Sequence, residues 1–108
     1  YAASKGAIRG MTKAVATECG RFGWNIRVNS IHPGVFHSEM LENVCREYVQ
    51  LGLLPDMKTA MSSVEAMAPL GIGQADDVAN AVRYLASDAA RWVTGSELVV
   101  DGGAVNCR

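Results

Sequence analysis

The sequence predicts an α/β fold built around a parallel β-sheet, and three features of the chain support this class. Apolar residues recur at helical spacing from residue 2 to about residue 22. Residues 25–32 and 96–101 have strand character, and the segments between them have helical periodicity. Strands separated by helices of this length predict a parallel sheet with right-handed crossovers.

The first predicted element is an amphipathic helix over residues 2–22. Its expected buried stripe recurs at intervals of three or four residues and consists of Ile8, Met11, Val15, Cys19 and Phe22. Lys and Arg dominate the positions expected to be exposed. We expect the helix to stop at Gly20 to Gly23, because glycine tolerates the left-handed backbone in which helices commonly end.

Residues 25–32 are predicted to form a strand. Alternating positions carry Ile26, Val28 and Ser30 on one face and Arg27, Asn29 and Ile31 on the other. Pro33 and Gly34 should end it, because proline cannot donate to a ladder and glycine permits a sharp turn.

Residues 39–68 are predicted to form one or two short helices broken at Pro55. Their apolar spacing is carried by Leu41, Val44, Tyr48, Leu51 and Leu54, and a methionine-rich amphipathic stretch follows. Methionine is flexible, so this stretch suits either a surface that closes over a variable apolar ligand or an irregular core. The sequence leaves both interpretations open.

The last third is predicted to hold a loop, a helix and a strand. Residues 69–73 form the loop, and Asp76 and Asp77 stand in the first turn of the helix, where its dipole favours acidic residues. The expected buried face is Val78, Ala81, Val82, Leu85 and Ala86. Two strands are few for a parallel sheet, so we expect part of the sheet to lie outside this chain.

The composition is that of a soluble globular protein, with 49% apolar residues and a net charge of −1. Lys and Arg are scattered and balanced, so we expect no nucleic-acid partner. No apolar run could span a bilayer and no signal-peptide pattern opens the chain, so we expect no membrane partner. Cys19, Cys45 and Cys107 lie far apart, so we expect no metal site, a reduced cytoplasmic setting, a buried Cys19 and an exposed Cys107.

Tyr1 and Lys5 stand four residues apart at the head of the first predicted helix, so their side chains share one face. A phenol with a pKa near ~10 is a poor base at neutral pH, and a nearby ammonium favours the phenolate. Such a pair can pass a proton to or from a substrate oxygen while a hydride moves at the adjacent carbon. Taken alone, the spacing is weak evidence.

Four segments in order resemble the short-chain dehydrogenase/reductase family. They read YAASKG at residues 1–6, IRVNSIHPG at 26–34, LASD at 85–88 and TGSELVVDGG at 94–103. Four such matches in order are very improbable by chance. The chain is identified as the C-terminal part of a member, beginning at the tyrosine of the Tyr-x-x-x-Lys motif. Residues 22–25 and 31–34 look most like hydroxysteroid and secondary-alcohol dehydrogenases.

The resemblance implies the C-terminal part of a doubly wound, parallel-sheet Rossmann fold whose sheet is incomplete in this chain. Tyr1 matches the family's catalytic acid/base, and Lys5 matches the lysine that assists it and hydrogen-bonds the nicotinamide ribose. Pro33, Gly34 and Val35 match the turn beside the nicotinamide. Phe36 falls where a backbone N–H and C=O usually meet the carboxamide.

Three polar residues near this turn need separate interpretations. Ser38 stands where the family often has threonine, whose hydroxyl bonds the carboxamide or phosphate; it could also cap the following helix, or do both. His32 is expected to be packed or hydrogen-bonded and not catalytic. His37 either contacts substrate or is a solvated loop residue.

The resemblance also implies a function for the parent protein: interconversion of a secondary alcohol and a ketone with NAD or NADP, on a small hydrophobic substrate. One alternative is a non-catalytic fragment or assembly module, and another is a 3-oxoacyl-carrier-protein reductase. Members commonly form tetramers through elements that match residues 2–22 and 76–101. A homo-tetramer is therefore expected.

The glycine-rich turn and the serine of the family pattern have no counterpart in the sequence. We therefore expect residues 1–108 to be the C-terminal half of one dinucleotide-binding domain, with the substrate side and the oligomer interface and without a second domain. These residues alone should neither bind the dinucleotide properly nor turn over.

Overall fold

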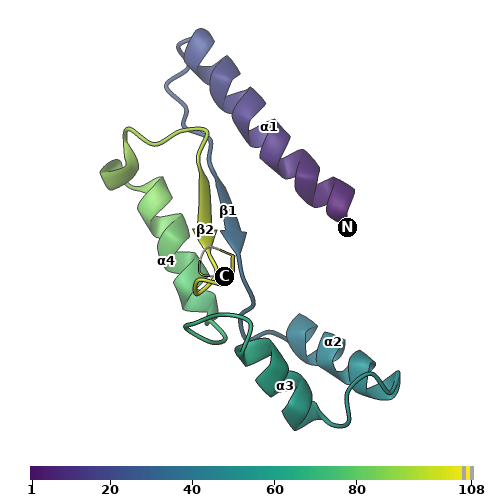
Figure 1. Ribbon diagram of the computed structural model, residues 1–108. Coiled ribbons are helices and arrows are strands. Elements are labelled where there is room, and N and C mark those ends of the chain that lie inside the picture. Colours follow the sequence, from purple (N-terminus) through teal and green to yellow (C-terminus); the bar gives the residue numbers. More distant parts are fainter. Residues whose placement is uncertain (106, 108) are drawn as a thin grey trace. The chain divides into compact units, whose positions relative to one another are not determined.

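The computed structural model describes residues 1–105 and 107. Its elements are α1 (Ala2–Arg21), β1 (Ser30–Pro33), α2 (Glu39–Gln50), α3 (Met57–Glu65), α4 (Ala75–Ala86), a 3-10 helix (Asp88–Ala90) and β2 (Glu97–Val100) (Figure 1). This order confirms the α/β class. The chain divides into two compact units, which are described separately. The first unit holds residues 1–32 and 79–99, and the second holds 33–78 and the described residues from 100 on.

β1 and β2 form a two-stranded sheet. In the first unit the N–H of Ser30 donates to the carbonyl of Ser96 at 3.0 Å, and in the second the N–H of Gly34 donates to the carbonyl of Val100 at 2.9 Å. The partners advance together along both segments, so the strands are parallel. This confirms the predicted parallel sheet with few strands.

The strand predicted at residues 25–32 was wrong in its first half, because regular pairing begins only at Ser30. Asn25 has a left-handed backbone with φ of 54°. The side chain of Asn29 donates to the carbonyl of Val93 at 2.9 Å and accepts from the N–H of Ser96 at 3.0 Å. Before β1 the N–H of Gly95 donates to the carbonyl of Val28 at 2.7 Å and the Asn29 side chain makes further contacts, so the pairing there is irregular.

Helix α1 confirms the predicted helix and the burial of Cys19, but most of the rest of the predicted buried stripe was wrong. The buried residues are Thr12, Ala16 and Cys19, whereas Met11 is 60% and Phe22 is 66% exposed. A Cβ added to Gly95 would lie 3.6 Å from the Cβ of Ala16. The buried face is therefore a face of small residues, which allow close approach of the neighbouring backbone and carry little hydrophobic signal.

In the second unit, α2 and α3 lie side by side (Figure 1) and confirm the two short helices predicted there. Leu41, Cys45 and Ala60 form the buried cluster, with Val49, Leu54, Met57, Met61, Val64 and Ile72 packed against it. Met57 and Met61 therefore serve the core, whereas Met40 is 76% exposed. The break covers residues 51–56 and includes Pro55 as predicted, although α2 already ends before Gly52, whose φ is 70°.

Helix α4 begins close to the predicted position, where Asp77 Oδ2 accepts the N–H of Gln74 at 2.8 Å. The predicted face is confirmed only in part: Val78, Ala81 and Leu85 are partly buried, but no residue of α4 is fully buried and Val82 is 51% exposed. The apolar stripe predicts that this face of the helix packs against another part of a protein. The described residues do not fully cover it. No helix in residues 1–105 has the length and apolarity needed to cross a membrane.

Candidate functional site

The turn after β1 is shaped by a close approach between two backbones of the second unit. A Cβ added to Gly34 would lie 2.6 Å from Cα and 2.7 Å from Cβ of Asp101. Contacts this short are not tolerated, so residue 34 must be glycine for the N–H to reach the carbonyl of Val100. The predicted role of Gly34 in a sharp turn thus has a specific steric cause.

The segment after this turn pairs with the loop before α4. The N–H of Gly73 donates to the carbonyl of Val35 at 3.1 Å, and the N–H of His37 donates to the carbonyl of Gly73 at 2.9 Å. In such a bridge the N–H and C=O of the middle residue point away from the partner. Within the described residues neither backbone group of Phe36 forms a backbone hydrogen bond.

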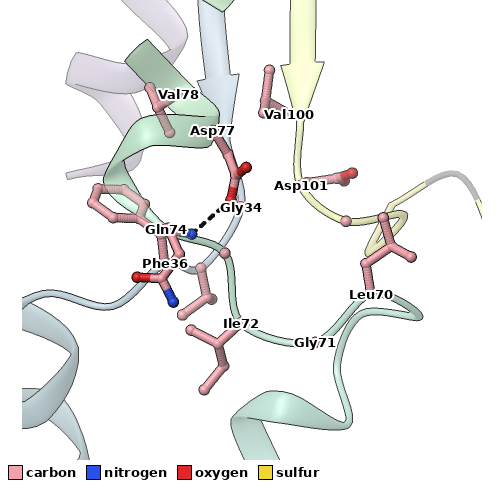
Figure 2. A pocket seen from close by; sticks show the side chains of 13 residues that line it. Gly34, Phe36, Leu70, Gly71, Ile72, Gln74, Asp77, Val78, Val100 and Asp101 are labelled. Carbon is pink, nitrogen blue, oxygen red and sulfur yellow. Dashed lines mark hydrogen bonds between the residues drawn. The ribbon is translucent and has the colours of Figure 1, made fainter. Parts of the chain in front are cut away.

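A cavity of about 280 Å³ opens beside this bridge (Figure 2). Its wall includes three of the predicted site residues, namely Gly34, Val35 and Phe36. The other lining residues are Leu70, Gly71, Ile72, Gly73, Gln74, Asp77, Val78, Val100, Asp101 and Gly102. The volume is close to the lower end of small-molecule sites. Pro33 and Ser38 do not line it.

The two carboxylates in this cavity wall are already engaged by backbone. Asp77 holds the N–H of Gln74, and Asp101 accepts the N–H of Gly103 and of Val105, each at 2.9 Å. Both aspartates therefore fix the loops that form the wall.

Ser38 is the N-cap of α2, and its Oγ accepts the N–H of Leu41 at 3.2 Å. This confirms the capping interpretation of the sequence. The hydroxyl keeps its own proton, because the cap uses it only as an acceptor.

Tyr1 and Lys5 lie in the first unit, at the start of α1. The ammonium nitrogen of Lys5 lies over the ring of Tyr1, 5.4 Å from the ring centroid, and Tyr1 is 94% exposed. The structure thus brings these two side chains together, as their spacing predicts. The other predicted site residues, Pro33 to Ser38, belong to the second unit.

The two histidines have different surroundings. Nε2 of His32 lies 2.8 Å from Oγ of Ser30, which confirms the expectation of a hydrogen-bonded residue. His37 is exposed and lines a second hollow of about 290 Å³. Lys58, Met61, Ser62, Glu65, Leu70, Gly71 and Ile72 complete that hollow. Both interpretations of His37 remain predictions.

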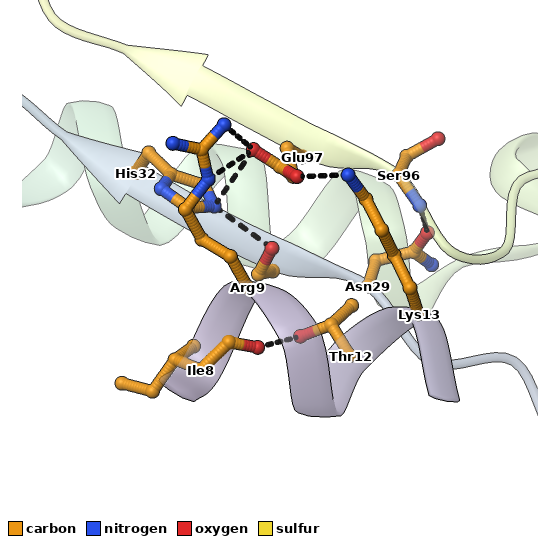
Figure 3. Close-up of polar contacts among 9 residues, drawn as sticks. Ile8, Arg9, Thr12, Lys13, Asn29, His32, Ser96 and Glu97 are labelled. Carbon is orange, nitrogen blue, oxygen red and sulfur yellow. Dashed lines mark hydrogen bonds and ion pairs between the residues drawn. The ribbon is translucent and has the colours of Figure 1, made fainter. Parts of the chain in front are cut away.

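Sequence reasoning missed one polar cluster, centred on Glu97 in the first unit (Figure 3). Arg9 places Nη2 at 2.7 Å from Oε2, and Lys13 places Nζ at 2.6 Å from Oε1. The contacts from Lys13 and then Arg9 hold the pKa of Glu97 below its ordinary value. Two sequence features could have indicated this cluster. Glu97 is a carboxylate in an otherwise apolar strand, and Arg9 and Lys13 are two cations four residues apart on one helix.

Comparison with known proteins gives the family. Residues 1–105 match the family model described as enoyl-(acyl carrier protein) reductase. The chain is 40% identical over 106 residues to an NADP-dependent (R)-specific alcohol dehydrogenase of Lentilactobacillus kefiri, covering 95% of this chain and 37% of that protein. It is 41% identical over 105 residues to a 3alpha-hydroxysteroid dehydrogenase of Mediterraneibacter gnavus, covering 96% and 36%.

The chain belongs to the short-chain dehydrogenase/reductase family. Solved structures agree with this. A short chain dehydrogenase family protein from Francisella tularensis subsp. tularensis SCHU S4 matches with a TM-score of 0.87 and 32% identity, over 96% of this chain and 42% of that one. A 4-hydroxyisoleucine dehydrogenase complexed with NADH matches with a TM-score of 0.77 and 42% identity, over 97% and 39%.

The family resemblance drawn from the four sequence segments is thus confirmed, as is the incomplete Rossmann sheet. This short-chain dehydrogenase/reductase chain spans 36–37% of the length of the two curated relatives. The individual roles of the predicted site residues stay predictions.

Proposed function

We propose that the full-length protein carrying this chain is an NAD(P)-dependent oxidoreductase that interconverts a secondary alcohol and a ketone. The observation that carries the proposal is the pairing of Tyr1 with Lys5 on one face of α1. The two curated relatives are named an alcohol dehydrogenase and a hydroxysteroid dehydrogenase. Both names support oxidation of an alcohol as the reaction.

In the proposed mechanism Tyr1 holds and moves the substrate proton. Its phenol oxygen takes the hydroxyl proton during oxidation and returns it to the carbonyl oxygen during reduction. Lys5 places its ammonium group over the Tyr1 ring, 5.4 Å from the ring centroid, and would bind the nicotinamide ribose. The nicotinamide supplies the hydride chemistry when it is bound. Because the relatives and neighbours include an NADP-dependent enzyme and an NADH complex, the cofactor is proposed to be NAD or NADP.

The residues after β1 suit the carboxamide end of that cofactor. Phe36 offers a backbone N–H and C=O that make no backbone hydrogen bond within the described residues, and a carboxamide needs one donor and one acceptor. Pro33, Gly34 and Val35 form the turn that sets their position. Ser38 can donate its hydroxyl proton to the carboxamide or a phosphate while its oxygen keeps capping α2.

The substrate is proposed to be a small hydrophobic alcohol or ketone. Met61, Leu70 and Ile72 give the second hollow an apolar wall, and His37 stands at its edge. We also propose a reduced, cytoplasmic setting, which the free thiols of Cys19, Cys45 and Cys107 support.

The test is Tyr1→Phe in the full-length protein, assayed by NAD(P)H absorbance with a panel of secondary alcohols. We expect kcat to fall by roughly 100-fold or more, because general acid/base catalysis contributes about that much. Tyr48→Phe is the matched control, since Tyr48 is also a partly exposed helix tyrosine, 47% exposed on α2. An unreduced rate in Tyr1→Phe would exclude the assigned role.

A second candidate function is that of an assembly module, and exposed apolar side chains favour it. Phe22 and Trp24 stack with ring centroids 5.1 Å apart and are 66% and 55% exposed, and Met11 is 60% exposed. Such groups are candidates for a homo-oligomer interface, with a tetramer expected. Titration of the full-length protein with NADPH and NADH separates the two functions, because an assembly module should show no saturable binding, whereas the oxidoreductase should.

A further inference from the structure

Four long side chains share one stripe on the N-terminal part of α1. Tyr1 is the N-cap of α1, and Lys5, Arg9 and Lys13 follow at intervals of four residues; each step in the helix advances about 6 Å and turns about 40°, so the stripe winds around the helix. The first two are the proposed acid/base pair. The last two hold the carboxylate of Glu97 on β2.

Arg9 and Lys13, both on α1, make close contacts with the carboxylate of Glu97. Nε and Nη2 of Arg9 lie 2.8 and 2.7 Å from Oε2, and Nζ of Lys13 lies 2.6 Å from Oε1 (Figure 3). Only 17% of the Glu97 side chain is exposed, and Oε1 itself has almost no contact with solvent. A carboxylate held by two cations at both oxygens therefore ties one stripe of α1 to β2.

Packing gives the start of α1 little support within the described residues. None of residues 1–11 is buried, and the first buried residue of the helix is Thr12. The Glu97 contact to Arg9 falls inside this exposed half, one turn after Lys5. A rotation of α1 by about 10° would move a group at a radius of about 6 Å by about 1 Å.

We infer that Glu97 is a positioning residue for the proposed acid/base pair, fixing the rotation of α1 and so the direction in which Tyr1 and Lys5 point. This rests on the proposed function. Misplacement of a reacting group by about 1 Å can cost up to roughly 100-fold in rate, so a contact remote from the chemistry can matter.

Charged groups surround Glu97, so removing its charge should change the contact between α1 and β2. Arg9 and Lys13 face it from α1, and His32 faces it from β1 with Nε2 at 4.0 Å from Oε2. Glu97→Gln keeps the shape but removes the charge that holds Arg9 and Lys13. The contact that ties α1 to β2 is therefore lost.

The experiment compares Glu97→Gln, Glu97→Asp, Arg9→Gln and the double variant Glu97→Gln/Arg9→Gln in the full-length protein. Glu18→Gln is the matched control, because it removes one exposed carboxylate from α1 itself. The readouts are kcat, the KM for cofactor and the midpoint of thermal unfolding, with kcat measured well below that midpoint so that only folded enzyme is compared.

We expect Glu97→Gln to lower kcat by about 10-fold or more while the KM for cofactor changes less than about 3-fold, because misorientation acts on the reaction step. Glu97→Asp should recover part of the rate, since it restores the charge. The double variant should lose little more than Glu97→Gln alone, because both changes remove one contact. Additive losses, or no recovery in Glu97→Asp, would indicate a merely structural role and overturn the inference.

Arg9→Gln and Tyr1→Phe give results that can be interpreted even if Glu97→Gln does not fold. If Glu97→Gln does not fold, Arg9→Gln replaces it, because the Arg9 side chain is 61% exposed, and an unchanged kcat in folded Arg9→Gln contradicts the inference. Tyr1→Phe is assayed alongside. A low rate in Tyr1→Phe with a normal rate in Glu97→Gln overturns only the positioning role, whereas a normal rate in Tyr1→Phe overturns the proposed function as well.

Discussion

Gly34 and Asp101 approach each other so closely that a Cβ on residue 34 would lie 2.6 Å from Cα and 3.1 Å from the carbonyl oxygen of Asp101. Both atoms belong to the main chain, so no side-chain rotation can relieve the clash. The turn that leads to Val35 and Phe36 therefore depends on the absence of a side chain at one position.

Gly34→Ala should destabilise the protein and weaken cofactor binding. We expect a loss of about 1–3 kcal/mol in the free energy of unfolding, the usual cost of forcing an extra methyl group into a filled space. Urea unfolding and a cofactor titration measure the two effects. Gly10→Ala is the control, because a Cβ there meets nothing within 4 Å and alanine favours the middle of α1. Equal stability of the Gly34→Ala and Gly10→Ala variants would contradict the steric argument.

Features that depend on neighbouring residues could be predicted from the sequence. The cap formed by Ser38 and the acidic start of α4 each follow from local backbone chemistry. The end of α1 was likewise predicted to within one residue of Phe22. In each case the residue that makes the contact lies within a few positions of the group that it satisfies.

Features that depend on distant partners could not be predicted. Arg9 and Glu97 are 88 residues apart, and helical periodicity treats Arg9 as a solvent-facing cation. The same holds for the buried face of α1, since Ala16 packs against Gly95, which is far away in the sequence. The early part of the predicted strand was wrong because its pairing is irregular: Gly95 donates to the carbonyl of Val28, and the next N–H, that of Ser96, donates to the side chain of Asn29.

Ser38 should serve stability and cofactor binding through different atoms. Ser38→Ala removes the cap and should cost about 1 kcal/mol in the free energy of unfolding. Ser38→Asp keeps a capping oxygen but has no proton to donate at neutral pH, so stability should stay within about 0.5 kcal/mol of the wild type. If the hydroxyl also donates to the cofactor, both variants should raise its dissociation constant. An unchanged dissociation constant in both variants would leave capping as the role of Ser38.

Leu41 should carry much of the stability of the helix pair α2 and α3. It is 8% exposed and packs with Cys45 and Ala60, so Leu41→Ala should cost about 2–5 kcal/mol. Leu51→Ala is the matched control, because Leu51 ends the same helix and is 64% exposed. Its effect should stay within about 0.5 kcal/mol. Thermal unfolding checks both, and similar losses in the two variants would contradict the assignment of the core.

Glu97 should make stability depend on pH in the acid range. Contacts from Lys13 and then Arg9 hold its pKa below its ordinary value of 4.5, so the folded state binds this proton less tightly than the unfolded state. The stabilisation is therefore fully present above the unfolded pKa and is lost as the pH falls through the lower, folded pKa. The stability difference between wild type and Glu97→Gln should be constant near neutral pH and shrink below about pH 5.

Urea unfolding of both proteins from pH 7 down to pH 3 measures this difference. Raising the salt concentration should reduce it at neutral pH, because Arg9 and Lys13 reach the carboxylate from exposed positions on α1. In an Arg9→Gln/Lys13→Gln background, Glu97→Gln should give a smaller difference with less pH dependence, since the groups that lower the pKa are gone. A difference that grows towards acid pH would mean that the carboxylate is destabilising in the folded state, and that the two cations do not hold α1 against β2.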